Sequence, residues 1–209
     1  YGFHKAKGHT QYPSADSFVR MLIDLNKCVA PKLYVMDGIV AMEGNGPGSG
    51  DPVPMNVLLM STDPVALDSV FSRLVYLKPE MVPTNYHGEK MGLGTWKEEE
   101  ITLLTPDGEI SMAEAVKKYG NPAFNVDRTE VRKNIWTRMA GALNIFQKKP
   151  YIEADKCVRC GICVQSCPVP GKAVDFRKGK GKPPVYDYRK CIRCFCCQEM
   201  CPKKAIKVK

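Results

Sequence analysis

The strongest constraint on this chain is a cysteine pattern that occurs twice near its C-terminal end. Each copy has the spacing C-x2-C-x2-C-x3-C, a proline follows at once, and the second copy begins 34 residues after the first. The copies hold Cys157, Cys160, Cys163 and Cys167, then Cys191, Cys194, Cys197 and Cys201. The first 150 residues contain only Cys28. This distribution indicates thiolate ligands for metal in a reducing compartment, not a disulfide framework.

The spacing is typical of iron–sulfur ligation. Three cysteines at x2 spacing place three sulfur atoms around one cubane cluster from a single loop, and the fourth ligand comes from the other motif. We therefore predict two [4Fe–4S] clusters with crossed ligand sets. One set is Cys157, Cys160, Cys163 and Cys201, and the other is Cys191, Cys194, Cys197 and Cys167.

Alternatives to this interpretation concern the metal and the remaining cysteines. Zinc sites use two C-x2-C pairs for one ion and do not need the doubled pattern. A second alternative is that the clusters only hold the domain together. Cys196 is either a packed free thiol or an exchangeable ligand. Cys28 lies on the apolar face of an expected helix, so we expect it in the core.

The net charge of +9 lies entirely in the cysteine-rich end, because 14 of the 31 basic residues but only 5 of the 22 acidic residues follow residue 150. Two clusters of about −2 each would offset part of this charge. We therefore do not expect nucleic-acid binding. The basic stretch with Lys178, Lys180 and Lys182 is either a solvated hairpin tip or a docking patch for an acidic redox partner.

Residues 151–209 resemble the bacterial-type two-cluster ferredoxins over their whole length, with all eight ligand cysteines in place. The resemblance implies one-electron transfer and a fold of two ββα-like halves. The unit ADKC…CP…KAVDF recurs as YRKC…CP…KAIKV, which predicts an α+β ferredoxin-like domain with a pseudo-twofold repeat. The segment between Cys167 and Cys191 is longer than in the smallest ferredoxins, and we expect it to extend a hairpin.

The preceding residues alternate between helical and strand patterns. Asp63 or Thr62 can cap one helix, and Ser111 with Glu114 forms a capping box for another. Strands that alternate with helices predict an α/β domain with a mostly parallel sheet and helices packed on it. We assign residues 1–148 to this domain and residues 149–209 to the ferredoxin-like domain. The expected helices are 13–32, 61–77, 111–120 and 129–146, and the expected strands are 32–42, 55–60 and 101–110.

Residues 13 to about 105 look like the later part of a family known as domain of unknown function 362. The matching stretches are MLIDLNKCVAPKLYVMDGIVAMEGNGPGSGDP, LLMSTDPVALDSVFSRLV and the GLG at 92–94. That family is often fused to a ferredoxin module, but the resemblance implies little about activity. The chain begins at Tyr1 within a stretch typical of the middle of a domain, so we expect an N-terminally truncated fragment.

Acidic residues outside the cysteine motifs form the other candidate site. Asp37, Glu43, Asp63 and Asp68 lie at or near the expected strand ends, beside the Gly-rich loop 43–50. Ligands of open α/β sheets bind beyond the carboxyl ends of the strands, which favours a small-molecule ligand near Glu43 and Asp63. Turn chemistry and a helix cap explain the same residues without a ligand, and we favour this explanation for Asp63. The three histidines are scattered, and the sequence shows no catalytic set.

Two functions fit these observations. The first is a cytoplasmic iron–sulfur electron-transfer protein, whose α/β domain binds a redox partner or a ligand. The second is a reductase whose α/β domain binds a small-molecule substrate and receives electrons from the clusters. No secretion signal is visible, and no run of 18 apolar residues predicts a membrane span.

Overall fold

The computed structural model describes residues 8, 11–12, 14–45, 49–129 and 149–208. The chain divides into two compact units, and each is described by itself. The first contains Ser14–Gly44 and Asp51–Thr129, and the second contains the segment from Glu130 to Lys209. The predicted boundary between residues 148 and 149 lies at the edge of a stretch outside the described residues, so it stays a prediction.

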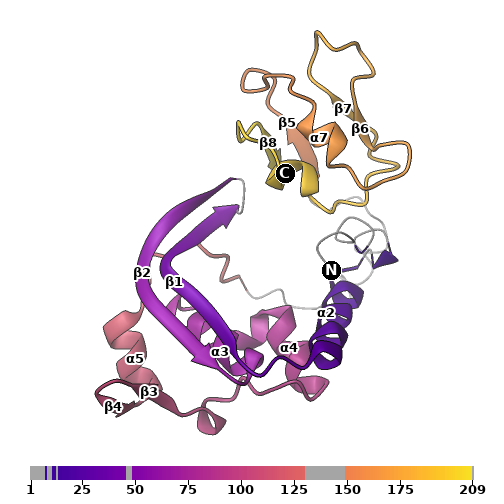
Figure 1. The fold of residues 1–209 in the computed structure, drawn as a ribbon. Coiled ribbons are helices and arrows are strands. Elements are labelled where there is room, and N and C mark those ends of the chain that lie inside the picture. The colour runs from indigo at the N-terminus through magenta and orange to yellow at the C-terminus, as the bar shows by residue number, and fades with distance from the viewer. Residues whose placement is uncertain (1–7, 9–10, 13, 46–48, 130–148, 209) are drawn as a thin grey trace. The chain divides into compact units, whose positions relative to one another are not determined.

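The first unit contains helices and two-stranded sheets (Figure 1). In chain order its elements are α2 (Ala15–Val29), β1 (Tyr34–Asn45), β2 (Ser49–Ser61), α3 (Pro64–Leu74), η2 (Pro79–Met81), α4 (Pro83–Lys90), η3 (Glu98–Glu100), β3 (Leu103–Thr105), β4 (Gly108–Ile110) and α5 (Met112–Tyr119).

The long strands β1 and β2 form a two-stranded sheet by themselves. Parallel neighbours need a crossover of a dozen or more residues, whereas only residues 46–48 separate these two strands. They therefore pair as a hairpin, as Figure 1 shows. The mostly parallel sheet that we predicted is not found among the described residues. Residues 43–45 and 49–50 of the expected Gly-rich loop 43–50 are instead extended chain at the ends of β1 and β2.

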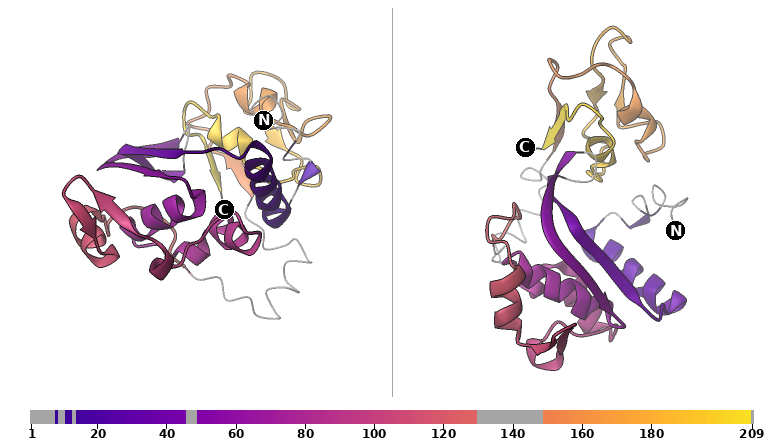
Figure 2. Two further views of the ribbon diagram at one scale, coloured as in Figure 1. Left: turned by 60° about the horizontal axis from the view of Figure 1, so that its bottom comes forward. Right: turned by 60° about the vertical axis from the view of Figure 1, so that its left-hand side comes forward.

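One face of the hairpin packs against α3 (Figure 2). Met55 and Val57 from β2 are buried in one core cluster with Leu74 of α3 and with Phe124. Gly38 on β1 allows the close approach, because an added Cβ atom there would lie 2.8 Å from the Val57 side chain. The opposite face exposes apolar side chains. They include Val35, Ile39, Val40, Met42, Leu58 and Met60.

Ser14 caps helix α2, since its side chain accepts a hydrogen bond from the Ser17 N–H. Its buried residues are Val19 and Ile23, which lie one turn apart. The prediction that Cys28 lies in the core is wrong, because this residue in the last turn is exposed. The helix packs on α4, and His87 of α4 contacts Asp16 with a distance of 2.8 Å between Nε2 and Oδ1.

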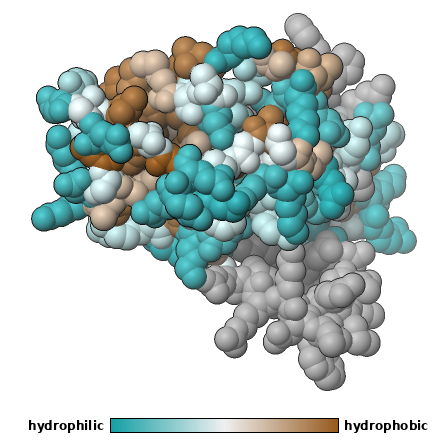
Figure 3. All heavy atoms as spheres, turned by 90° about the horizontal axis from the view of Figure 1, so that it is seen from below, coloured by the Kyte–Doolittle hydropathy of each residue, from teal (hydrophilic) through white to brown (hydrophobic). Residues whose placement is uncertain are grey.

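Other local predictions are confirmed. Asp63 caps α3, and Ser111 with Glu114 forms the capping box of α5. The stretch 101–110, which we predicted as one strand, differs, because it forms two short antiparallel strands, β3 and β4. The helix predicted over residues 129–146 lies almost wholly outside the described residues. No helix in the described ranges is both long and apolar enough to cross a membrane. Figure 3 shows hydrophobic residues gathered on one part of the surface, among hydrophilic ones.

The second unit consists of very short elements. They are β5 (Pro150–Ile152), α7 (Ile162–Gln165), β6 (Val174–Asp175), β7 (Val185–Tyr186), α8 (Cys196–Glu199) and β8 (Ile206–Val208). Strand β5 pairs antiparallel with β8, and β6 pairs antiparallel with β7. The core between them contains Val174 and Ile206, which are 1% and 2% exposed.

The backbone of the second unit repeats at the same offset as the cysteines. Arg159 and Arg193 both have positive φ, at 59° and 56°. Gly161 and Phe195, two residues later, also have positive φ, at 79° and 58°, and each precedes a short helix. The two cysteine loops therefore have the same local conformation. The sequence repeat predicts this likeness, even though Phe195 adopts a conformation that favours glycine.

Candidate metal centre

Two cavities in the second unit are lined by cysteines. The first is bounded by Cys157, Cys160, Cys163 and Cys201, and the second by Cys167, Cys191, Cys194 and Cys197. The space between their lining residues is about 360 Å³ and about 300 Å³, open solvent included. Most of the other lining residues are apolar, such as Ile206 in the first cavity and Val174 in the second.

Each cavity takes three cysteines from one motif and the last cysteine from the other. This is the grouping that the crossed hypothesis predicts for the clusters. Within the described ranges, no three His, Cys, Asp or Glu side chains converge closely enough to hold one metal ion. The cysteines instead surround a space. Their role as cluster ligands stays a prediction.

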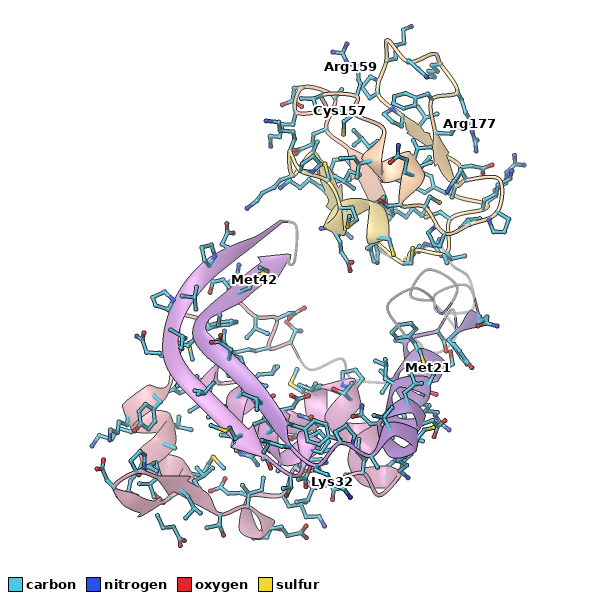
Figure 4. The ribbon with its side chains drawn as sticks, viewed as in Figure 1. Met21, Lys32, Met42, Cys157, Arg159 and Arg177 are labelled. Carbon is cyan, nitrogen blue, oxygen red and sulfur yellow. The ribbon has the colours of Figure 1, made fainter. Side chains whose placement is uncertain are left out.

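The loops around the cavities direct backbone N–H groups at sulfur. The Ala173 N–H donates to Cys167 Sγ at 3.3 Å, and the Ala205 N–H donates to Cys201 Sγ at 3.4 Å. Ala173 and Ala205 are equivalent in the sequence repeat. Hydrogen bonds from backbone donors favour the charged form of an acceptor, so both contacts suit a thiolate ligand. Cys157 lies on the loop that leads to α7 (Figure 4).

Burial governs the acidity of the inner cysteines. It raises the pKa of Cys163 to about 11 and that of Cys197 to about 11. The pKa of Cys191 is also raised by burial. These thiols are therefore neutral in the free protein at pH 7, and iron binding must release their protons.

The Tyr186 hydroxyl is a feature that our sequence analysis missed. It donates a hydrogen bond to Cys197 Sγ at 3.1 Å. Tyr186 comes five residues before Cys191, and the equivalent position before Cys157 is Ile152. Aligning the two motifs at their 34-residue offset would have revealed this difference.

Cys196 lies beside the second cavity but does not line it. It is the first residue of α8 and is 8% exposed. Its thiol hydrogen-bonds to that of Cys194, and this contact together with burial raises the pKa of Cys194. The equivalent residue in the first motif is Ile162, which indicates that an apolar side chain suits this position.

The basic stretch forms the turn between β6 and β7. Lys178, Lys180 and Lys182 are all exposed there, and backbone hydrogen bonds such as Gly179 N–H to Phe176 O shape the turn. At its base, Arg177 pairs with Asp187 at 3.4 Å. Figure 4 labels Arg177 at the edge of this segment. The side chains of three lysines are thus exposed on this turn.

The structure does not bring the acidic candidates of the first unit together. Asp63 follows the end of β2, whereas Glu43 lies near the connection between β1 and β2. Almost the whole length of the hairpin therefore separates them. In a parallel sheet the same strand ends would have met at one edge.

Three of the acidic candidates have a structural task. Glu43 accepts a hydrogen bond from the Asn125 N–H at 2.8 Å, and Asp37 accepts one from the Ile39 N–H. Asp63 caps α3 and also binds the Thr95 N–H. Asp68 is half-buried, and burial raises its pKa. His87 contacts Asp16, and the other two histidines lie outside the described residues.

Comparison with known proteins accounts for both ends of the chain. Residues 149–202 match the family model of the 4Fe-4S dicluster domain. Residues 1–73 match the model of a domain of unknown function, DUF362. The chain therefore combines a DUF362 segment with an iron–sulfur domain of the ferredoxin type. The expected resemblance up to residue 105, with its GLG at 92–94, extends beyond the matched residues.

One curated relative also matches part of the chain. The thylakoid-associated protein sll1697 of Synechocystis sp. (strain ATCC 27184 / PCC 6803 / Kazusa) is 43% identical over 79 residues. These residues make up 38% of this chain and 25% of the relative. The aligned part thus spans a quarter of the length of the relative that it matches.

Proposed function

We propose that this protein transfers single electrons through two [4Fe–4S] clusters held by crossed cysteine sets. The observation that carries the proposal is the pair of four-cysteine cavities, each built from both motifs. A bound [4Fe–4S] cluster supplies one-electron transfer. The dicluster match over residues 149–202 supports this chemistry.

The residues around the cavities fit such clusters. Four thiols and apolar neighbours line each space, and Cys163 and Cys197 are each less than 10% exposed. The Ala173 and Ala205 N–H groups stabilise negative charge on Cys167 and Cys201. We infer that the two halves of the domain are related by a pseudo-twofold axis. The repeated loop conformations and the pairing of β5 with β8 and β6 with β7 support this inference.

The charge of the iron–sulfur domain suggests its partner. Two clusters of about −2 each leave a surplus near +5 from the residue charge of this end. An acidic redox protein is attracted by such a surface, and Lys178, Lys180 and Lys182 present it on an exposed turn. The basic charge thus serves the clusters and a protein partner, not nucleic acid. The many free thiols suit a reducing compartment such as the cytoplasm.

The alternative is a reductase in which the first unit binds a substrate. The first unit has an open groove of about 700 Å³ that could serve as the substrate site of such a reductase. The lining of this groove includes Arg73, Lys78 and Lys117. Volumes of this size hold small molecules. A ligand near Glu43 or Asp63 is less favoured, because both carboxylates bind backbone N–H groups.

Iron and sulfide analysis of anaerobically purified protein tests the proposal. We expect about eight iron and eight sulfide per chain, from two cubanes with four ligands each. Stoichiometric zinc without broad absorbance near ~400 nm would reject the iron–sulfur assignment. Clusters that no low-potential one-electron donor reduces would instead show a purely structural role.

The reductase is tested on the same preparation. A bound small molecule besides iron and sulfide would support it, particularly if Lys78→Glu and Lys117→Glu in the groove weaken its retention. Electron transfer to a protein acceptor with no bound small molecule supports the electron-transfer function.

A further inference from the structure

The two cysteine cavities differ at one equivalent position. Ile152 lines the first cavity and Tyr186 lines the second, and both residues precede their motif by the same distance. Their strand partners are equivalent as well, because Ile152 pairs with Ile206 and Tyr186 pairs with Val174. The repeat thus provides its own comparison of a cavity with and without a phenol.

The Tyr186 hydroxyl donates to Cys197 Sγ at 3.1 Å. The equivalent sulfur in the first cavity belongs to Cys163, and Ile152 offers it no donor. Cys197 and Cys163 are buried to a similar degree, at 7% and 9% exposed. The clearest difference between their surroundings is therefore the hydroxyl.

The ring of Tyr186 is held in place by its neighbour. It stacks on Tyr188 with a centroid distance of 5.6 Å and an interplanar angle of 13°. The Tyr188 hydroxyl donates to the Pro150 carbonyl at 2.9 Å, which anchors the stack to β5. The direction of the Tyr186 hydroxyl is thus fixed before any cluster is bound.

We propose that Tyr186 makes the two clusters unequal, so that the cluster of Cys191, Cys194, Cys197 and Cys167 is reduced first. A hydrogen bond to a ligand sulfur stabilises the extra negative charge of the reduced state, which raises the reduction potential. Tyr186 keeps its proton throughout, and each cluster gains one electron from a low-potential one-electron donor. This inference rests on the proposed function and assigns a direction to it.

Tyr186→Phe in the full chain is the direct test, because it removes the hydroxyl and keeps the ring. A redox titration with mediators, followed by electron paramagnetic resonance, should show two waves in the wild-type protein. In the variant, we expect the reduction potential of the higher-potential wave to fall by about 59 mV. This shift is a tenfold decrease in the equilibrium constant of a one-electron reduction. The lower wave should stay in place. Tyr151→Phe is the matched control, since Tyr151 lies in the same unit and lines neither cysteine cavity.

The outcomes separate this inference from the proposed function. A protein without iron and sulfide rejects both. A protein with two clusters that titrate together in the wild type rejects the inference alone, whatever the variants do. Equal shifts of both waves in Tyr186→Phe, or an equal effect of Tyr151→Phe, also reject it. A downward shift of the higher wave that only Tyr186→Phe produces supports it.

Discussion

Asp63 and Thr95 are joined by a hydrogen bond that spans 32 residues of sequence, with 2.9 Å between Asp63 Oδ2 and the Thr95 nitrogen. The other carboxylate oxygen caps α3 through the N–H groups of Val65 and Ala66. Gly94 adjoins the same carboxylate, because a Cβ atom there would lie 1.8 Å from Oδ1. One side chain thus fixes both the start of a helix and the loop beside it.

Asp63→Ala should lower the free energy of unfolding of the first unit by about 1–2 kcal/mol or more, the cost of losing a helix cap plus the loop contact. Urea unfolding followed by tryptophan fluorescence in a Trp136→Phe background measures this, because Trp96 is then the only tryptophan and lies in the first unit. Asp37→Ala is the control, since its exposed carboxylate makes only a local turn contact with Ile39. An equal loss in both variants would contradict a special role for Asp63.

Asp68→Asn should stabilise the first unit at pH 7 but not in acid. Burial raises the folded-state pKa of Asp68 above its ordinary value of 3.8, so the ionised form is disfavoured in the folded state. The resulting cost is present above the folded pKa and disappears as the pH falls through it towards the unfolded pKa. Urea unfolding at pH 7 and at lower pH tests this difference. The exposed Asp24→Asn serves as control, and a pH-independent gain in Asp68→Asn would contradict the explanation.

Cys201→Ala should damage the cluster whose other ligands are Cys157, Cys160 and Cys163, because Cys201 lines their cavity. Electron paramagnetic resonance, with iron analysis, should show loss of this cluster and retention of the other. Cys196→Ser is the matched control and should leave both clusters intact, since Cys196 lines neither cavity. Damage confined to the cluster of Cys191, Cys194 and Cys197 in Cys201→Ala would show that each motif closes on itself.

Electron transfer with the physiological partner should slow as ionic strength rises, because salt screens surface charge with a Debye length of about 10 Å at 0.1 M. Replacing Lys178, Lys180 and Lys182 together with glutamate should slow the reaction further at low salt. The same change at Lys27, Lys32 and Lys118 of the first unit alters net charge equally and is the control. Stopped-flow rates that stay flat with salt would show that the basic surface only balances the clusters.

Local features of this fold follow from the sequence, because they depend on neighbouring residues. The Ser111–Glu114 capping box and the Asp63 cap need only a few positions, and the structure has both. The cysteine spacing likewise predicts which thiols gather in each cavity. Apolar stretches say less about how strands pair. The sequence of residues 32–42 and 55–60 is compatible both with buried parallel strands and with a half-exposed hairpin. The connection between β1 and β2 is too short for a parallel crossover, so the two strands must pair as a hairpin.

Features that depend on packing were harder to predict. Cys28 has the spacing of a core residue on α2, yet the buried stripe of this helix runs through Val19 and Ile23. The packing of α2 against α4 determines which face of α2 is buried, and the sequence of α2 alone does not show that face. The contact between Tyr186 and Cys197 depends on the pairing of β6 with β7, which brings distant residues together.

The pairing of β5 with β8 has a consequence for how the protein is made. These are the first and last described strands of the iron–sulfur domain, and they pair from Pro150 with Val208 to Ile152 with Ile206. The chain between β5 and β8 forms a long loop, and closing it costs conformational entropy. The pairing offsets this cost only when both strands are present. During synthesis, β5 must therefore wait until β8 has left the ribosome. Cys201, which completes the first cavity, emerges just before β8, so iron insertion at that cavity is expected after translation of the domain, not during it.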